Sequence, residues 1–287
     1  MHTRTNILFR PLASLLLLAA TLSPLPGAWT LPLQPGEHLT YRVAWAILPG
    51  AGEIKIDAAP PTGNAGQMLV TATTNTRGLA RMLLPFEARS DSLFDVTTGR
   101  IVSLHEKSRT RKKQAEHTVT FNHASHEAIY ARAVPPEPPR PLEIPSGDPT
   151  DLMMGLLQTR TWDIKPGEKR DALVLFDDDF YELTLYALNY EEVRTPIGRF
   201  NTLVLQPRME KTPPKGMFRR GSTVRVWIAQ DEHRLPVKFE VEFKIGTGVA
   251  TLESYRPPPA VVAGSGAPPD RASGGGTASS DAKNSSP

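Results

Sequence analysis

The most regular feature of the sequence is the alternation of apolar and polar side chains along short segments. Between His38 and Trp45 a large apolar residue stands at every second position, and Ile54 and Ile56 alternate with charged residues in the next segment. A period of two is typical of a β-strand with one buried face. The pattern predicts strands at His38–Trp45, Gly52–Asp57, Met68–Asn75, Phe86–Phe94, Ile101–Ser108, Glu116–Phe121, Ala128–Ala133, Ala172–Phe176, Tyr181–Tyr190, Asn201–Gln206, Thr223–Ile228, Val237–Phe243 and Val249–Tyr255.

Turn-forming residues separate almost every neighbouring pair of these segments. Pro49-Gly50 follows the first strand, and Thr97–Gly99 and Gly246–Gly248 follow later ones. Short connections of this kind join antiparallel strands, since parallel strands need long crossovers. The sequence therefore predicts a mainly β protein whose sheet is mostly antiparallel and built from hairpins.

Two segments depart from the strand pattern and predict helices. Residues Arg77–Leu84 form a short candidate. Residues 148–160 form the better one, because Asp148 can cap the free amides of the first turn and Pro149 suits the first helical position. Asp151 then lies favourably at the positive end of the helix dipole.

The better helix carries an apolar stripe, formed by Leu152, Met153, Leu156 and Leu157. A Pro-rich linker, residues 134–145, leads into it and divides the β region into halves at residues 31–133 and 161–256. We expect the helix to cover one end or face of the sheet.

About a dozen strands with only one good helix to cover them predict one large curved antiparallel sheet, an open or half barrel with a central and a short helix. A sheet that curls incompletely has an apolar trough, and we expect this trough to bind a hydrophobic or lipid ligand beneath the helix. The residues expected at that site are Met153, Met154, Leu156 and Leu157. Alternatively, the same side chains complete a dry core, since apolar stripes are more often core than ligand site.

The two ends of the chain predict export. Arg4 and Arg10 precede a run of about 11 mostly apolar residues, which is too short for a membrane span of roughly 20. Residues 1–28 therefore read as a cleaved signal peptide. With no cysteine in the chain a lipobox is not expected. Residues 257–287 have almost no large apolar side chain and predict a disordered tail. We expect a periplasmic protein that does not span the membrane, with one β domain at residues 31–256.

The net charge argues against nucleic acid as a partner. The full chain carries 33 basic and 30 acidic residues. Loss of Arg4 and Arg10 with the signal peptide leaves the mature chain only one positive charge above neutrality. A nucleic-acid-binding protein usually has a strong basic excess.

Three consecutive aspartates, Asp177 to Asp179, offer the strongest hint of an active site. They lie between two strand-like segments, where a short hairpin loop is a common connection and aspartate tolerates left-handed conformations. A calcium loop of the EF-hand type would need Asp, Asn and Gly at alternate positions and a Glu at its twelfth position. If Asp177 were the first position, the twelfth would be Leu188, so the pattern does not fit. We expect a hairpin turn, with a carboxylate or calcium site as the less favoured alternative.

Other candidate chemistry is sparse. His123 and His126 have spacing compatible with a metal, but they lie in a predicted turn, so neither a metal nor a cofactor is expected. No Gly-x-Ser-x-Gly elbow lies between a predicted strand and a predicted helix. The basic run Arg109–Lys113 is expected to lie at the tip of a hairpin, and a patch for anionic lipid head groups is the alternative. The same two interpretations apply to Arg219-Arg220.

The order of several short motifs resembles the bacterial family of unknown function DUF3108. The matching residues are Pro35–Val43, Gly50–Glu53, Phe94, Gly99, Asp148-Pro149, Pro166-Gly167, Phe176-Asp177, Thr195–Phe200, Gly216–Gly221, Trp227 and Arg234–Val237. The resemblance extends over roughly residues 33–255. It implies a cell-envelope β protein without an assigned reaction, so it transfers no catalytic residue.

Together these features predict a non-enzymatic cell-envelope protein that binds a lipid or an envelope protein. A structural or assembly role in the envelope is the first alternative. A hydrolase that assembles its acid and base from separate strands is the weaker one.

Overall fold

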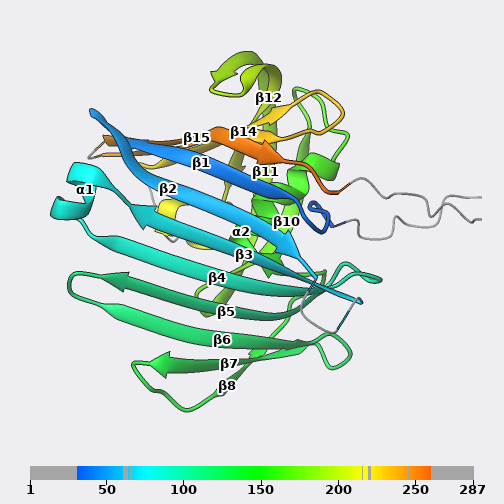
Figure 1. The fold of residues 1–287 in the computed structure, drawn as a ribbon. Coiled ribbons are helices and arrows are strands. Elements are labelled where there is room, and N and C mark those ends of the chain that lie inside the picture. The colour runs from blue at the N-terminus through cyan, green and yellow to red at the C-terminus, as the bar shows by residue number, and fades with distance from the viewer. Residues whose placement is uncertain are drawn as a thin grey trace, which may run out of the picture.

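The computed structural model describes residues 31–60, 64, 66–214, 216–218, 221–244 and 246–259. The predicted signal peptide, Arg219-Arg220 and residues 260–287 of the predicted tail lie outside these ranges. The described chain consists mainly of strands, with a few short helices (Figure 1). The mainly β class is thereby confirmed.

All the strands belong to one sheet, in the order β8-β7-β6-β5-β4-β3-β2-β1-β15-β14-β13-β12-β11-β10-β9. The pairing of β9 with β10 is parallel, and the other neighbouring pairs are antiparallel. The bounds are β1 (His38–Trp45), β2 (Leu48–Ala59), β3 (Gln67–Thr76), β4 (Phe86–Asp95), β5 (Ile101–Thr110), β6 (Gln114–Asn122), β7 (Glu127–Val134), β8 (Arg140–Glu143), β9 (Thr150–Asp151), β10 (Lys169–Phe176), β11 (Asp179–Thr195), β12 (Gly198–Arg208), β13 (Thr223–Ala229), β14 (Pro236–Phe243) and β15 (Gly246–Arg256). The first and last strands are neighbours at the centre, so one sheet includes both predicted halves.

The sheet curves until its two ends approach each other. Figure 1 shows β1 to β8 in front, with β10 and β11 behind them. Arg140 on β8 binds Asp178 in the β10–β11 turn at 2.5 Å, and Arg132 on β7 lies 3.6 Å from Asp177. The expected open, curved antiparallel sheet is confirmed, and these ion pairs hold its two edges together.

The first hairpin turns earlier than the sequence predicted. Trp45 pairs with Leu48, so Ala46 and Ile47 form the turn. The predicted turn at Pro49-Gly50 was wrong, because pairing with β1 extends β2 back to Leu48. Ala46 has a φ of 48°, and the cross-strand hydrogen bonds offset the cost of this left-handed conformation.

The two helices lie near their predicted positions, but the central one is shorter. The short helix α1 spans Gly78–Leu83, whereas α2 spans only Leu152–Leu157 and continues into the 3-10 helix η1 (Gln158–Thr161). Asp151 rather than Asp148 caps α2, accepting a hydrogen bond from the Met154 N–H at 2.9 Å. The residues before it pair with β10 in an extended conformation, so the helix begins only after them.

A strand also forms inside the Pro-rich linker, where none was predicted. Arg140–Glu143 form β8, which pairs with β7 at one edge of the sheet. An edge strand tolerates Pro141 because its outward side has no further strand that needs an N–H donor.

The interior is filled by two hydrophobic clusters. The first lies between the two halves and includes Tyr41, Phe94 and Tyr130, all about 1% exposed or less. The second lies against β10 to β13 and includes Leu183 and Trp162. Helix α2 links the clusters, since Met154 and Leu157 belong to the first and Leu156 to the second.

A buried ion pair joins segments that are distant in sequence. The Nη2 atom of Arg160 lies 3.0 Å from Oε1 of Glu37, and the two side chains are only 9% and 3% exposed. Arg160 also donates to the carbonyl oxygens of Pro32 at 2.7 Å and His233 at 2.9 Å. Glu37 accepts a hydrogen bond from the Tyr255 hydroxyl at 2.8 Å. The pair therefore connects the N-terminal segment, η1, the β13–β14 turn and β15.

Replacing Arg160 by methionine should lower the free energy of unfolding by about 3–5 kcal/mol, because it leaves the Glu37 carboxylate buried without its cation. Urea denaturation followed by circular dichroism measures the loss. Arg194→Met is the matched control, since the ion pair of Arg194 with Glu192 is largely exposed and should contribute under about 1 kcal/mol. Similar small losses for both variants would contradict a central role for the buried pair.

Candidate functional site

The residues predicted to bind a hydrophobic ligand lie in the core. Met154, Leu156 and Leu157 are 2%, 5% and 0% exposed, and Met153 is half-buried against the first cluster. Neither of the two hollows described below is lined by any of the four. Their packing matches the dry-core alternative, and an apolar ligand site beneath α2 gains no support from it.

The three aspartates form a hairpin turn, as predicted, and they also have a second role. Phe176 pairs with Asp179, so the loop itself is Asp177 and Asp178, with Asp177 at a φ of 61°. Asp177 lies opposite Arg132 on β7, and Asp178 binds Arg140 on β8, so both ion pairs join the β10–β11 turn to the other end of the sheet. The carboxylates therefore help to hold the two ends of the open sheet together, a role that the local sequence does not reveal.

The histidines of the predicted β6–β7 turn lie in that turn. His126 has a φ of 54°, and the ring of His123 is hydrogen-bonded to the Ile101 carbonyl oxygen at 2.7 Å. Across the described ranges, no group of three or more His, Asp or Glu side chains is arranged to hold a metal ion.

Asp151 is a carboxyl group with a strongly altered environment. It is 4% exposed, and burial raises its pKa from 3.8 to about 6, against the opposing effect of the Met154 N–H hydrogen bond. The carboxyl lies at the start of α2, inside the protein. It acts as a helix cap and cannot contact a ligand at the surface.

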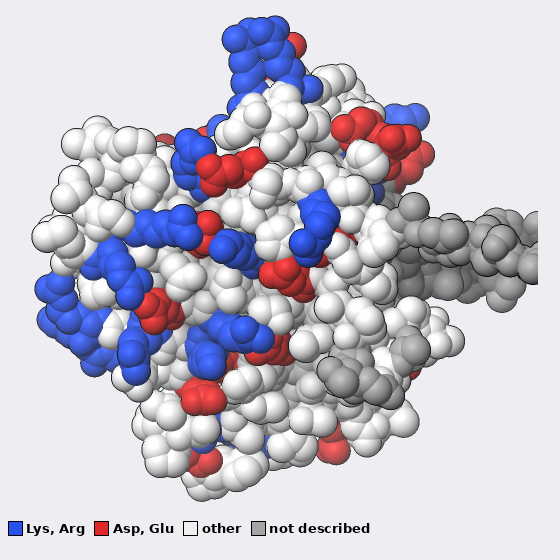
Figure 2. Space-filling view, viewed as in Figure 1, with Lys and Arg blue, Asp and Glu red and all other residues white. Residues whose placement is uncertain are grey.

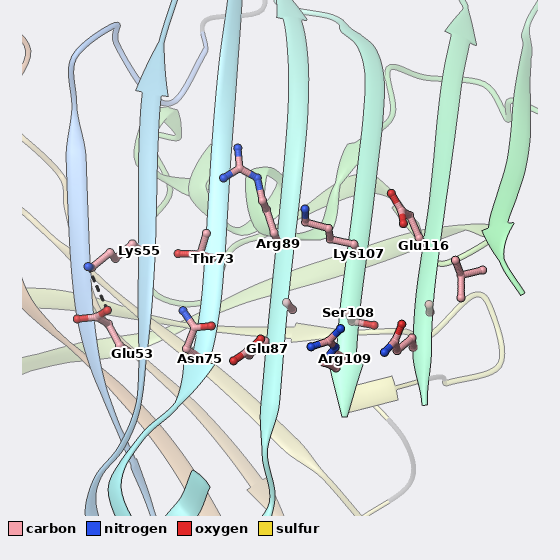
Figure 3. A pocket seen from close by; sticks show the side chains of 14 residues that line it. Glu53, Lys55, Thr73, Asn75, Glu87, Arg89, Lys107, Ser108, Arg109 and Glu116 are labelled. Atoms are coloured by element: carbon pink, nitrogen blue, oxygen red, sulfur yellow. Dashed lines mark ion pairs between the residues drawn. The ribbon is translucent and has the colours of Figure 1, made fainter. Parts of the chain in front are cut away.

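A hollow of about 480 Å³ lies over the outer face of β2 to β6; we call it the outer hollow (Figure 3). The strand register aligns its side chains in two rows. One row is Lys55, Thr73, Arg89, Lys107 and Glu116, and the other is Glu53, Asn75, Glu87, Arg109 and Gln114. Because side chains alternate across a strand, both rows face away from the core residues Ile54 and Ile56.

Two cations of the outer hollow, Lys107 and Arg109, make no ion pair among the described residues, although Glu116 and Glu87 lie opposite them on the neighbouring strands. Glu53 lies 2.6 Å from Arg77 and Glu87 lies 2.5 Å from Arg81, so these carboxylates are already paired. The side chains of Lys107 and Arg109 make no ion pair with any residue in the described part of the chain. They stand two residues apart on one face of β5, about 7 Å along the strand. The hollow therefore offers two cations beside hydrogen-bonding side chains.

A second hollow, of about 550 Å³, lies between the loop before α2, η1 and β10–β11. The Arg170 guanidinium stacks over the Trp162 ring at 4.8 Å. Asp171 and Glu182 line the hollow, and both carboxylates bind Lys211. Because both acids bind the same lysine, this pair is better suited to holding β10 and β11 together than to acid–base chemistry.

The basic run Arg109–Lys113 tips a hairpin, as predicted, since β5 ends at Thr110 and β6 begins at Gln114. Arg111 donates a hydrogen bond to the Met82 carbonyl oxygen at 2.6 Å, which joins the hairpin to α1. Figure 2 shows lysine and arginine side chains gathered at the end of the sheet that carries α1 in Figure 1. The outer hollow lies beside this basic end.

Residues 40–253 match the model of a family described as a protein of unknown function, DUF3108. The chain belongs to the DUF3108 family. The resemblance seen in the sequence is confirmed, and the family description assigns no reaction. Among proteins with curated functions, none matches the chain in sequence.

Comparison with solved structures finds proteins of other families. A β-barrel-like protein of domain of unknown function DUF1849 from Brucella abortus superposes with a TM-score of 0.50 at 7% identity, covering 78% of this chain and 98% of that one. A protein with a YmcC-like fold from Bacteroides fragilis has a TM-score of 0.32 at 12% identity, covering 80% and 100%. The first likeness shows that the DUF3108 chain shares a β-barrel-like fold. None of the helices in the described ranges has the length and apolar character needed to cross a membrane.

Between about pH 4 and pH 6 the buried Asp151 should make the fold less stable as the pH rises. Its pKa is higher in the folded state, so folding binds a proton in this range and the ionised form is penalised above it. The rise of the pKa of Asp151 from 3.8 to about 6 corresponds to on the order of 3 kcal/mol. Asp151→Asn keeps the oxygen that caps Met154 but cannot ionise, so it should gain stability relative to the original protein between pH 4 and pH 7.

Urea denaturation of the original protein and of Asp151→Asn at pH 4 and at pH 7 measures this difference. Asp163→Asn, at an exposed aspartate, is the matched control and should follow the original protein at both. If Asp151→Asn shows the same pH dependence as the control, the buried carboxyl does not titrate as described.

Proposed function

We propose that this DUF3108 protein is an exported, non-enzymatic protein of the cell envelope that binds an acidic glycan in the outer hollow. The observation that carries the proposal is the pair Lys107 and Arg109, two cations on one face of β5 that make no ion pair with a described residue and line a hollow of about 480 Å³. Cations of this kind bind carboxylate or phosphate groups through charge-assisted hydrogen bonds. The envelope is where such a polymer would be met.

Export rests on the start of the sequence. Arg4 and Arg10, a short apolar run and small residues before Ala28 form the pattern of a cleaved signal peptide. The absence of cysteine leaves no residue for lipid attachment by a lipobox. These features support a periplasmic location.

The other side chains of the outer hollow suit a hydroxylated ligand. Asn75 and Gln114 each offer both a donor and an acceptor, and Thr73 adds a hydroxyl group. A sugar ring presents hydroxyls in the same alternation of donors and acceptors. An acidic sugar therefore combines the two properties that the hollow can recognise.

Two features favour binding over catalysis. Asp151, whose pKa is raised to about 6, is buried and lines neither hollow. Asp171 and Glu182, which do line a hollow, share the Lys211 cation. A hydrolase needs an acid and a base that reach the substrate, and these carboxylates do not meet that need.

The interior supports a scaffold more than a lipid trough. Met154 and Leu157 fill the space between the halves, so an acyl chain would have to displace them. A structural or assembly role in the envelope agrees with this packing and does not conflict with a glycan bound on the outer face.

Isothermal titration with a galacturonic acid hexamer should detect binding that weakens as salt is added. Lys107→Glu should weaken it by at least about tenfold, because it replaces a charge-assisted hydrogen bond with repulsion. Arg194→Glu is the matched control: it makes the same change of charge at another exposed site and should bind like the original protein.

A neutral maltohexaose tests the chemistry of the ligand. The proposal expects it to bind much more weakly than the acidic hexamer. Equal binding of both sugars, or equal binding by Lys107→Glu and the original protein, would remove the acidic-glycan assignment and leave the assembly role.

A further inference from the structure

Several large apolar side chains are exposed at one end of the sheet. On α1, Leu79, Met82 and Leu83 are 65%, 71% and 65% exposed, and Leu84 just after it is 70% exposed. Ile47, at the tip of the β1–β2 hairpin, is 92% exposed. Isolated exposed apolar residues are common on proteins, but a group of this kind marks an interaction surface.

All these residues lie at the same end of the sheet. Antiparallel pairing places the β1–β2 turn, the β3–β4 connection with α1 and the β5–β6 turn together. Gly78 at the start of α1 lies close to the backbone of Gly50 near the start of β2, which confirms that α1 adjoins the first hairpin. The chain enters β1 at His38 and leaves β15 at Arg256, which pair at the opposite end.

Basic side chains flank the apolar group. They are Arg77, Arg81, Arg109, Arg111, Lys112 and Lys113. Arg77 and Arg81 are paired with Glu53 and Glu87. The side chains of Lys112 and Lys113 are exposed and make no ion pair with any residue that the structure describes. We call the apolar group and these six cations the docking edge.

Internal contacts hold the docking edge together. Arg111 at the hairpin tip donates to the Met82 carbonyl oxygen at the end of α1, at 2.6 Å. The helix has no buried residue. Its apolar side chains therefore do not hold it against the sheet, and its hydrogen bonds to the neighbouring hairpin and strands do.

We propose that the docking edge binds the surface of an anionic phospholipid bilayer. Leu79, Met82 and Leu83 stand at positions i, i+3 and i+4 of one helix face, so they can enter the acyl boundary together. Lysine and arginine beside them then lie at the level of the head groups and attract anionic lipids. The end where the chain enters and leaves the sheet faces away from the membrane.

A bilayer explains the shape of the docking edge better than an apolar pocket on a protein does. The apolar side chains project from a short helix at the tip of the sheet, and none of them lines either of the two larger hollows. A projecting apolar tip among cations matches a surface that is negative outside and apolar beneath. A partner with a purely acidic surface would match the cations but would leave these side chains in water.

Co-sedimentation with vesicles of about three parts phosphatidylethanolamine to one part phosphatidylglycerol tests the proposal. The original protein should bind these vesicles and should bind pure phosphatidylcholine vesicles much more weakly. Leu79→Ser/Met82→Ser/Leu83→Ser should reduce binding at least about tenfold, because each change removes apolar surface that would enter the bilayer. The substituted side chains are exposed, so thermal unfolding followed by circular dichroism should be nearly unchanged.

Charge is tested separately with Lys112→Glu/Lys113→Glu, which should also weaken binding at least about tenfold and reduce its salt dependence. The matched charge control is Arg194→Glu/Arg199→Glu, and the matched apolar control is Ile197→Ser, at an exposed isoleucine in the β11–β12 turn. Both controls should sediment like the original protein. Lys107→Glu should lose the acidic glycan but keep most of the vesicle binding, which separates this inference from the proposed function.

Two results would overturn the inference. One is equal sedimentation of the original protein and both docking-edge variants. The other is a dimer in light scattering that the serine variant converts to a monomer, since the apolar group would then be an interface between two copies of the chain.

Discussion

The structure depends first on the buried pair of Arg160 and Glu37. An arginine whose guanidinium is almost completely buried is costly unless its hydrogen-bond donors are used, and here they bind the Glu37 carboxylate and the carbonyl oxygens of Pro32 and His233. Arg234 adds a second link, donating to the carbonyl oxygens of Arg160 and Trp162 at 2.8 and 2.6 Å. The network fixes the segment after α2 against both the N-terminal segment and the last strand, β15. It thereby sets how the two halves meet around the core.

This constraint explains why the two faces of the sheet differ. Once the halves are fixed around α2, the inner positions of the strands must fill one continuous core, and the outer positions remain free to carry charge. On β2 the inner Ile54 and Ile56 pack against the core while Glu53 and Lys55 line the outer hollow. The binding surface that we propose is therefore built on the rigid outer side of strands whose inner side is buried. Such a surface needs no movement of α2.

Much of the fold could be predicted from the sequence because strand alternation is a local signal. The strand His38–Trp45 was predicted with its observed bounds. The start of α2 was not, because Asp148-Pro149 and Asp151 are both good starting signals and only the pairing with β10 decides between them. Proline hid β8 for a similar reason, since it is compatible with a strand only at a sheet edge.

The candidate sites were less predictable because they depend on register. Lys55, Arg89 and Lys107 come from separate strands and form one row only after three pairings are known. The sequence did indicate the basic run at the β5–β6 turn and the short helix at Arg77–Leu84. It could not indicate that they are neighbours, because the hydrogen bond from Arg111 to Met82 spans 29 residues. Local patterns thus identified the elements, and long-range pairing decided which side chains lie together.

Helix α1 differs from the rest of the fold because its apolar side chains are exposed. Its apolar side chains would stabilise the protein if they turned inward, yet none of its residues is buried, and the basic hairpin holds it at the tip of the sheet. Exposed apolar surface favours aggregation, and a group of exposed apolar side chains is typical of an interaction surface. The outer hollow lies beside this tip, and Arg109 belongs to both surfaces. A chain docked through α1 would therefore hold the hollow close to the membrane surface, where an acidic glycan attached to a lipid would be presented.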